Sequence, residues 1–395
     1  MKIQLYFRTA SIRLLISLAL ALAALTPGTA APSAARASGA YVVDTATDGP
    51  DVVDNGICNN TIDGCSLRAA IDQATADGVP TTITFAIGLD GQTLLLNDAY
   101  GTILWDGSNI TVTTLAFNIT VSGANLSGSQ SLFQISGSHN TLNNLTLKDA
   151  PGSAVSVGDF YDLNNGNFNL LSGLNIIGNG AAGITVSGGG TSGGLGNRIL
   201  SDYIGMTDPF ALGCAGEGNT GGVIVGLEAR ATTIESSIIG CSSQHGVVID
   251  GSGGSPLGTL ITNTAIGINL ANPIPNGLAG VAILDAQDID LETNLISGNG
   301  SQGIYVTGAA ARPITITHNL IGTGYNGNSA VPNLLDGILV NGVSLSSTLI
   351  VSNTISGNGA AGVHINNSAY VSITNNLIGV DVFGIAAIPN DGDGV

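Results

Sequence analysis

Three carboxylates in one short segment form the densest group of chemically active side chains in this sequence. Asp288, Asp290 and Glu292 alternate with the apolar residues Ile289 and Leu291. Successive side chains of a β-strand point to opposite faces, so the alternation predicts that all three acids point outward. Carboxylate oxygens bind calcium or sugar hydroxyl groups. The other interpretation, which we favour, is a solvated strand whose charges discourage lateral aggregation.

A second group of acids lies near the N-terminus. Asp44, Asp48, Asp51 and Asp54 precede a pair of cysteines. Such oxygen ligands hold calcium, although their spacing is not that of an EF-hand loop. We predict no cofactor, with calcium as the one alternative. No spacing of cysteines or histidines resembles a zinc site, so we predict no other metal.

The four cysteines indicate an oxidising compartment. Cys58 and Cys65 are close in sequence, whereas Cys214 and Cys241 are farther apart. Disulfides persist in exported proteins, and proximity favours a bridge between Cys58 and Cys65. The pairing of the other two stays open, because four cysteines allow three connectivities.

The N-terminus predicts export. Lys2, Arg8 and Arg13 form a positive n-region, and an apolar run and small residues follow. This layout is typical of a secretory signal peptide, which we assign to residues 1–37. The apolar run is shorter than the roughly 20 residues of a membrane-spanning helix. We predict a secreted or cell-surface protein without a transmembrane span in the mature chain.

The charge of the mature chain restricts its partners. Beyond residue 37 there are five basic and 27 acidic residues, a net charge of −22. Such a field repels nucleic acid and anionic membranes, and disfavours an anionic polysaccharide unless cations bridge the two. Charged residues make up only 9% of the chain and apolar residues 44%, which indicates a long folded core rather than acidic disorder.

Internal repeats run through most of the chain. A short unit recurs with equivalent isoleucines at Ile176, Ile239, Ile296 and Ile355. A long unit begins with an Ile-Gly pair, as at Ile204, and makes an excursion before it re-enters at a glycine. Two units in a period of about 60 residues give about 28 to 32 residues per unit, which is typical of a solenoid.

The strand after each re-entry glycine predicts the architecture. In segments 184–186 and 338–340 the first and third residues are apolar and β-branched, so both point to one face. Coils stacked about 4.8 Å apart would line these faces into one core. We therefore predict an all-β fold, a right-handed parallel β-helix (solenoid) with a short N-terminal capping helix.

Glycine and asparagine recur at the corners between strands. Both residue types tolerate positive φ, so we expect them to make the turns. Four asparagines hold the same position before the third strand, and their amides are expected to bond from coil to coil. These are Asn294, Asn319, Asn353 and Asn376.

A segment of different character lies between the signal peptide and the first repeats. Ser66 is a plausible N-cap, and Leu67, Ala70, Ile71 and Ala74 fall on one helical face. Residues 82–87 are predicted as a strand. An amphipathic helix here would cover the open end of the first coil. The predicted domains are a signal peptide (1–37), a cap segment with the cysteine pair (38–100) and β-helix repeats (101–395).

The repeats are expected to continue past residue 395. Gly394 and Val395 match the re-entry glycine and the first inward residue of a new strand, as Gly337 and Ile338 do earlier. An uncovered last coil would expose an apolar cross-section and unpaired strand edges, so we expect end-to-end association or fraying.

The cap segment and the repeats both resemble a known family. Residues 65–71, Cys-Ser-Leu-Arg-Ala-Ala-Ile, resemble the Cys-Ser-Leu-Arg-Glu-Ala motif of exported bacterial β-helix repeat proteins, except at Ala69. The repeats resemble those of the pectate-lyase-like superfamily, and together the two cover nearly the whole mature chain. The resemblance implies large extracellular proteins alongside polysaccharide lyases, hydrolases and epimerases. It is specific for architecture and weak for activity.

In enzymes of that superfamily, catalytic groups project outward from the first strand of neighbouring coils. In this chain the equivalent outward positions form one row of seven residues. The row contains no carboxylate, lysine or arginine, and so lacks the groups that a lyase or a hydrolase requires. We predict no catalytic residue there, and keep Tyr305 and His364 as binding candidates because exposed rings stack on sugars. The equivalent positions here are Thr185, Ile224, Val248, Ala282, Tyr305, Leu339 and His364.

These observations predict a secreted or cell-surface β-helix repeat protein with a binding, adhesive or structural role. The expected partner is a polysaccharide or cell-surface glycan, and we interpret the protein as a binder rather than an enzyme. The alternative is a carbohydrate-active enzyme (lyase, hydrolase or epimerase) with its site on the long excursions, such as 207–221 or 323–336. The binding candidates are Tyr305, His364, Asp288, Asp290 and Glu292.

Overall fold

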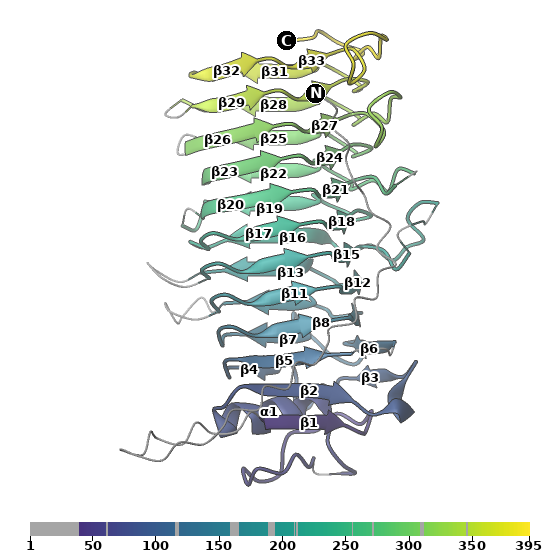
Figure 1. Cartoon of the computed structure of the whole chain (residues 1–395), viewed down its shortest axis with the longest axis vertical. Helices are drawn as coiled ribbons and strands as arrows, with labels where there is room; N and C mark the ends of the chain where they lie inside the picture. The colour runs from purple at the N-terminus through teal and green to yellow at the C-terminus, as the bar shows by residue number, and fades with distance from the viewer. Residues whose placement is uncertain are drawn as a thin grey trace, which may run out of the picture. The chain divides into compact units, whose positions relative to one another are not determined.

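The predicted parallel β-helix is confirmed. Each complete coil contributes one strand to each of three sheets, and the coils stack along one axis (Figure 1). The predicted signal peptide lies outside the described residues. The computed structural model describes residues 39–395 apart from 61, 115–117, 159–165, 189–193, 209, 211, 255, 271, 309–311 and 345–346.

The twelve-stranded sheet reaches from the cap to the last described coil, with neighbouring strands in parallel. Its strands are β1 (Gly39–Val43), β2 (Thr81–Phe85), β5 (Ile110–Thr113), β8 (Thr141–Asn143), β11 (Leu170–Ser172), β14 (Arg198–Leu200), β17 (Thr233–Glu235), β20 (Leu257–Thr262), β23 (Gln287–Glu292), β26 (Arg312–Thr317), β29 (Thr348–Val351) and β32 (Val371–Thr374).

The other two sheets have ten and eleven strands. The ten-stranded sheet consists of β4 (Ile103–Trp105), β7 (Phe133–Ile135), β10 (Val155–Val157), β13 (Ala182–Ser187), β16 (Gly221–Gly226), β19 (Val247–Asp250), β22 (Val281–Leu284), β25 (Ile304–Thr307), β28 (Ile338–Asn341) and β31 (Val363–Asn366). The eleven-stranded sheet consists of β3 (Thr93–Leu95), β6 (Ile119–Ser122), β9 (Leu145–Lys148), β12 (Asn175–Ile177), β15 (Tyr203–Ile204), β18 (Ile238–Ile239), β21 (Ala265–Ile266), β24 (Leu295–Ile296), β27 (Leu320–Ile321), β30 (Thr354–Ile355) and β33 (Leu377–Ile378).

Inward side chains of the three sheets form one continuous apolar core. Val223 and Val225 of β16 are fully buried, as are Ile304 and Val306 of β25. The parallel register places each residue against its equivalent in the next coil, for example Val281 against Ile304. Complete burial of a valine or isoleucine contributes about 1.5–3 kcal/mol, so these stacked columns supply most of the cohesion.

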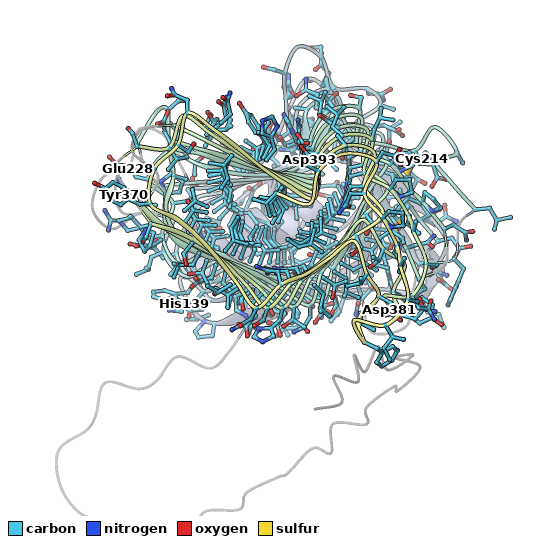
Figure 2. All side chains as sticks on the ribbon, turned by 90° about the horizontal axis from the view of Figure 1, so that it is seen from above. His139, Cys214, Glu228, Tyr370, Asp381 and Asp393 are labelled. Atoms are coloured by element: carbon cyan, nitrogen blue, oxygen red, sulfur yellow. A yellow bond between two sulfur atoms is a disulfide. The ribbon has the colours of Figure 1, made fainter. Side chains whose placement is uncertain are left out.

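From β15 onward long and short coils alternate, because an excursion follows every second strand of the eleven-stranded sheet, always at the same corner. An excursion follows β21 between Val247 and Val281, whereas none separates Val281 from Ile304. Figure 2 views the molecule down the axis on which the coils stack. It shows the excursions that carry Cys214 and Asp381 on one side, away from the corner of Glu228 and Tyr370.

The predicted asparagine ladder is confirmed at the corner between the twelve- and eleven-stranded sheets. Asn294 Nδ2 donates to Asn319 Oδ1 at 3.0 Å, and the same contact joins Asn319 to Asn353 and Asn353 to Asn376. Positive φ occurs at corner glycines such as Gly267 and Gly322, as expected, but at this corner it lies at the residue before each ladder asparagine, as at His318 (φ 57°). The turn is made there, because the asparagine already leads into the next strand.

A second asparagine ladder, which we did not predict, lies at the corner between the eleven- and ten-stranded sheets. Asn276 Nδ2 donates to Asn299 Oδ1, Asn299 to Asn333 and Asn333 to Asn358, each at 2.9 Å, and Asn358 donates to Asn390 at 3.0 Å. Its members come alternately from a Gly-Asn-Gly turn of a short coil and a Pro-Asn pair of a long excursion. Two unlike motifs therefore supply one repeated bond.

The predicted capping helix is α1 (Leu67–Asp77). The Ser66 hydroxyl oxygen accepts a hydrogen bond from the Ala69 N–H at 3.0 Å, and the predicted apolar face is buried. The predicted strand over 82–87 ends early, at Phe85. The Ala86 N–H makes the last bond to the neighbouring strand, and Ile87 begins the 3-10 turn η1 (Ile87–Leu89), where it is 80% exposed.

A buried ion pair fastens α1 to the first coils. Arg68 Nε and Nη2 lie 2.9 Å from Asp48 Oδ1 and Oδ2 respectively. The guanidinium also donates to the carbonyl oxygens of Gly101 and Thr102. Such a pair tolerates burial because its charges and donors are satisfied together. Arg68 thus joins three segments of the cap.

Both pairs of cysteines are bridged. The predicted Cys58–Cys65 disulfide is confirmed and closes a short loop beside α1. Cys214 pairs with Cys241, which ties the excursion after β15 to the end of β18 in the next coil. The described residues contain no free cysteine, in keeping with an oxidising environment.

Candidate functional site

The predicted outward row is continuous on the outer face of the ten-stranded sheet. Its seven residues are aligned strand by strand from Thr185 on β13 to His364 on β31. Most are half-exposed, but Ala282 has no exposed surface, because its methyl group lies between the larger side chains of Val248 and Tyr305 in the register. The row carries no formal charge between Ile224 and Leu339.

The two binding candidates of this row lie near its C-terminal end. Tyr305 on β25 is half-buried, and His364 on β31 is exposed. Leu339 lies between them in the register, so the two residues are about 10 Å apart along the axis, twice the strand spacing. The structure therefore brings both candidates onto one strip, which we define as the row from Ile224 to His364.

A second outward row, which we did not predict, runs beside these residues. Thr307, Asn341 and Asn366 are aligned in neighbouring strands, each two residues after a member of the first row. Asn366 Nδ2 donates to Asn341 Oδ1 at 3.0 Å. The period of two would have revealed this row had it been followed one step further along each strand. Amide and hydroxyl groups thus flank the apolar strip.

An excursion adds a carboxylate to the strip. Asp336 precedes the re-entry glycine of β28, and its Oδ2 lies 3.5 Å from His364 Nδ1. Its Oδ1 accepts a hydrogen bond from the Ala361 N–H at 3.0 Å, which holds the carboxylate in place. The Asp336 side chain is 11% exposed and that of His364 is 52% exposed. A fixed carboxylate therefore faces a partly solvated imidazole, a contact that sequence spacing alone does not indicate.

The position that Asp336 holds before β28 is held by His245 before β19, where it has a structural role. His245 Nδ1 accepts a hydrogen bond from the Ala279 N–H at 3.2 Å, as Asp336 accepts one from Ala361. Burial lowers the pKa of His245, and Nδ1 accepts the Ala279 N–H only while the ring is neutral. His245 is thus a neutral corner acceptor in neutral solution.

The acidic strand lies on a different sheet from Tyr305 and His364. Asp288, Asp290 and Glu292 are all exposed on β23, as the alternation predicts. The neighbouring strands place Leu260 and Thr315 beside Asp290, and no carboxylate beside it. Among the described residues no group of three acids, histidines or cysteines is arranged to hold a metal ion. Calcium binding at this strand stays the alternative to the solvated strand that we favour.

The aspartates before the cysteine pair bond within the cap. Asp44 Oδ1 accepts from the Cys65 N–H, Asp51 Oδ1 accepts from a backbone N–H, and Asp54 Oδ1 accepts from Gln73 Nε2. Asp48 is the partner of Arg68. These bonds fold the cap loop around α1, so the acids have a structural role whether or not calcium binds them.

The excursions lie over the outer face of the eleven-stranded sheet. Leu295 and Leu320, whose side chains point to that face, are 2% and 8% exposed. The Cys241 and Gly298 N–H groups donate to carbonyl oxygens of the excursions, at Ile274 and Val331. This covering explains why strands such as β24 are apolar on both faces.

No deep pocket accompanies these surfaces in the described part of the chain. The best-formed cavity there lies in the cap, lined by residues that include Thr45, Asp48 and Leu96. Its volume is about 10 Å³, roughly the room that one water molecule needs. Ligand binding on the described residues would therefore use an open surface. No helix among these residues has the length and apolarity needed to cross a membrane.

Comparisons with known proteins agree with the fold. Residues 221–388 match the family model described as "Right handed beta helix region". The A-module of the mannuronan C-5 epimerase AlgE4 from Azotobacter vinelandii is similar, with a TM-score of 0.57 and 16% identity over 87% of this chain and 94% of that chain. The chain is therefore a right-handed parallel β-helix protein.

Other solved structures of varied function are more distant. PfbA, a surface adhesin of Streptococcus pneumoniae, has a TM-score of 0.40 and 13% identity over 75% of this chain and 77% of that chain. An alginate lyase from Paenibacillus sp. has 0.43 and 14%, over 84% and 99%. A search of curated proteins gives no match. At such identities the likeness concerns the fold alone.

Proposed function

We propose that this protein is an extracellular glycan-binding β-helix protein that presents the outer face of its ten-stranded sheet to an uncharged polysaccharide. One observation carries the proposal: an aligned uncharged row from Ile224 to Leu339 lies on this outer face, and its last two members, Tyr305 and Leu339, have the hydroxyl and amide groups of Thr307 and Asn341 beside them. The absence of charge along that row contrasts with the acidity of the whole chain.

The chemistry of the strip suits a sugar polymer. Sugar rings offer C–H faces and hydroxyl edges, which match an apolar row flanked by donors and acceptors. Tyr305 supplies an aromatic face within that row. The mature net charge of −22 opposes uronic-acid polymers in the absence of bridging cations, so the proposal specifies an uncharged polymer.

Binding to a panel of neutral and uronic-acid polysaccharides tests the proposal. Tyr305→Ala is expected to weaken binding to the neutral polymers at least tenfold while the fold is retained. Tyr325→Ala is the matched control, because Tyr325 is 52% exposed on an excursion. A wild-type protein that binds no neutral polysaccharide would overturn the proposal, and loss of binding in the Tyr325 variant alone would move the site to the excursions.

A carbohydrate-active enzyme is the second candidate, and the Asp336–His364 contact favours it. An imidazole held beside a buried carboxylate is an arrangement that serves proton transfer to or from a bound substrate. Release of reducing ends or unsaturated uronides from the same panel would establish activity. In that case His364→Gln and Asp336→Asn should remove the products, whereas retained activity in both would exclude this pair.

A further inference from the structure

Asp202 stands at the position that asparagine occupies from Asn294 onward. It precedes β15, and the register of β15, β18, β21 and β24 makes Ser237, Thr264 and Asn294 its equivalents. Asp202 Oδ1 accepts a hydrogen bond from the Leu174 N–H at 2.7 Å, just as Asn294 Oδ1 accepts one from the Thr264 N–H at 3.0 Å. Asp202 is thus a carboxyl member of the first asparagine ladder.

The second oxygen of Asp202 takes the place of an amide nitrogen. Asn294 Nδ2 donates to the carbonyl oxygen of Ile261, and Asn319 Nδ2 to that of Leu291. Each acceptor lies three residues before the preceding ladder residue, which makes Leu171 the equivalent for Asp202. Asp202 Oδ2 is buried without a hydrogen-bond partner. An ionised carboxylate only accepts, whereas a protonated one donates as the amide does.

The surroundings of Asp202 favour the neutral acid. The residue has no exposed surface, and burial raises its pKa from 3.8 to about 8, although bonds from the backbone of Leu174 and Leu200 act in the opposite sense. Tyr203 is the adjacent titratable residue on β15. Arg198 of β14 and Glu235 of β17 pair with each other at 2.9 Å, with partly exposed side chains. No charged neighbour contributes to the shift of Asp202.

We propose that Asp202 is a neutral carboxylic acid that acts as a latch: its Oδ1 accepts from the Leu174 N–H, and its protonated Oδ2 donates to the Leu171 carbonyl oxygen, so that the coil of β14 and β15 is held against the coil before it. When this coil opens, Asp202 meets water and ionises. Opening therefore becomes easier as the pH rises. The excursion that begins after β15 is tied to the next coil by the Cys214–Cys241 disulfide. Loss of the Asp202 bonds therefore loosens the chain before this disulfide and not beyond it.

The direction of the pH dependence follows from the two states. In the open coil the carboxyl group ionises near its usual pKa of 3.8, whereas in the closed coil it keeps its proton up to about pH 8. Below pH 4 both states are protonated and the latch contributes fully. Between about pH 4 and 8 only the open state loses its proton, so the free energy of opening this coil decreases as the pH rises. Above about pH 8 both states are ionised, and the free energy of opening no longer changes with pH.

Hydrogen exchange between pH 5 and 9, corrected for the intrinsic exchange rate, tests the latch on the whole protein. Protection of peptides from 168–205 is expected to fall more than tenfold between pH 5 and 8, relative to peptides from 288–322. Asp202→Asn should remove this difference, because an amide donates at every pH. A pH-independent wild-type difference, or one that persists in the Asp202 variant, would overturn the proposal.

A transplanted acid and a direct probe sharpen the test. Asn319→Asp puts a carboxyl group at a buried ladder position, and is expected to transfer the pH dependence to peptides from 288–322. Infrared spectra at pH 6 should show the carbonyl band of a protonated carboxylic acid that is lost in Asp202→Asn. Identical spectra for the wild type and the Asp202 variant would contradict a neutral acid at this position.

Discussion

The outer faces of the ten-stranded and twelve-stranded sheets are built from the same alternating strands but carry opposite chemistry. On the ten-stranded sheet the central outward row is apolar, from Ile224 to Leu339. On the twelve-stranded sheet the outward residues include the Arg198–Glu235 ion pair and the exposed acids of β23. Behind both faces the inward residues are mostly buried aliphatic residues, joined by Trp105 and Phe133 in the first coils and by buried threonines such as Thr348.

This difference separates what the fold needs from what it leaves free. The inward positions fill one shared core, so nearly all of them are apolar from coil to coil. The outward positions make no contact with that core, and each face can acquire its own chemistry. A binding surface is therefore expected where the outward residues depart from the charged and hydroxylated character of the rest, which is the strip around Tyr305.

The largest effect is expected from a pair of substitutions on one strand. Ile249→Ala removes a fully buried side chain of β19 and should reduce the free energy of unfolding by about 2–5 kcal/mol. Val248→Ala, which changes the outward neighbour, should cost less than about 1 kcal/mol. Chemical denaturation of the two variants measures the difference. Equal losses would show that the outer face of this sheet is also packed.

An intermediate effect, on binding rather than on folding, is expected when charge is added to each face. Leu339→Glu places an acid in the apolar strip and should weaken binding of a neutral polysaccharide at least tenfold, or about 1.4 kcal/mol. Leu349→Glu makes the same change on β29 of the twelve-stranded sheet, where Leu349 is 36% exposed. It should leave binding unchanged. Equal weakening of binding by both substitutions would show that the two faces do not differ in polysaccharide binding.

The smallest effect on stability is expected from the acidic strand. Replacing Asp290 and Glu292 by threonine, together with Asp288, whose φ is 54°, by asparagine, should change the free energy of unfolding by less than about 0.5 kcal/mol per residue, because all three are exposed and asparagine tolerates positive φ. Self-association, followed by light scattering, should increase as the charge is removed. If calcium raises the melting temperature of the wild type and not of this variant, the strand is a calcium site instead.

Much of the architecture could be predicted because it depends on local patterns. The period of two in segments such as 184–186 assigns inward and outward faces, and Ser66 with the apolar positions of α1 indicates a capping helix. The proximity of Cys58 and Cys65 was enough to predict their bridge. Each of these inferences concerns residues that are close together in the chain, where backbone geometry alone decides the outcome.

Contacts between coils needed the tertiary structure, because coils of unequal length decide which distant residues become neighbours. Asp336 meets His364 only because an excursion ends one strand before β31. The Gly-Asn-Gly and Pro-Asn turns form one ladder only after stacking brings them into register. Asp202 is an ordinary acid in the sequence and a ladder member in the fold. The sequence by itself determined the coil and its two faces. Stacking decided which side chains act together, since hydrogen bonds and ion pairs form only over a few ångströms.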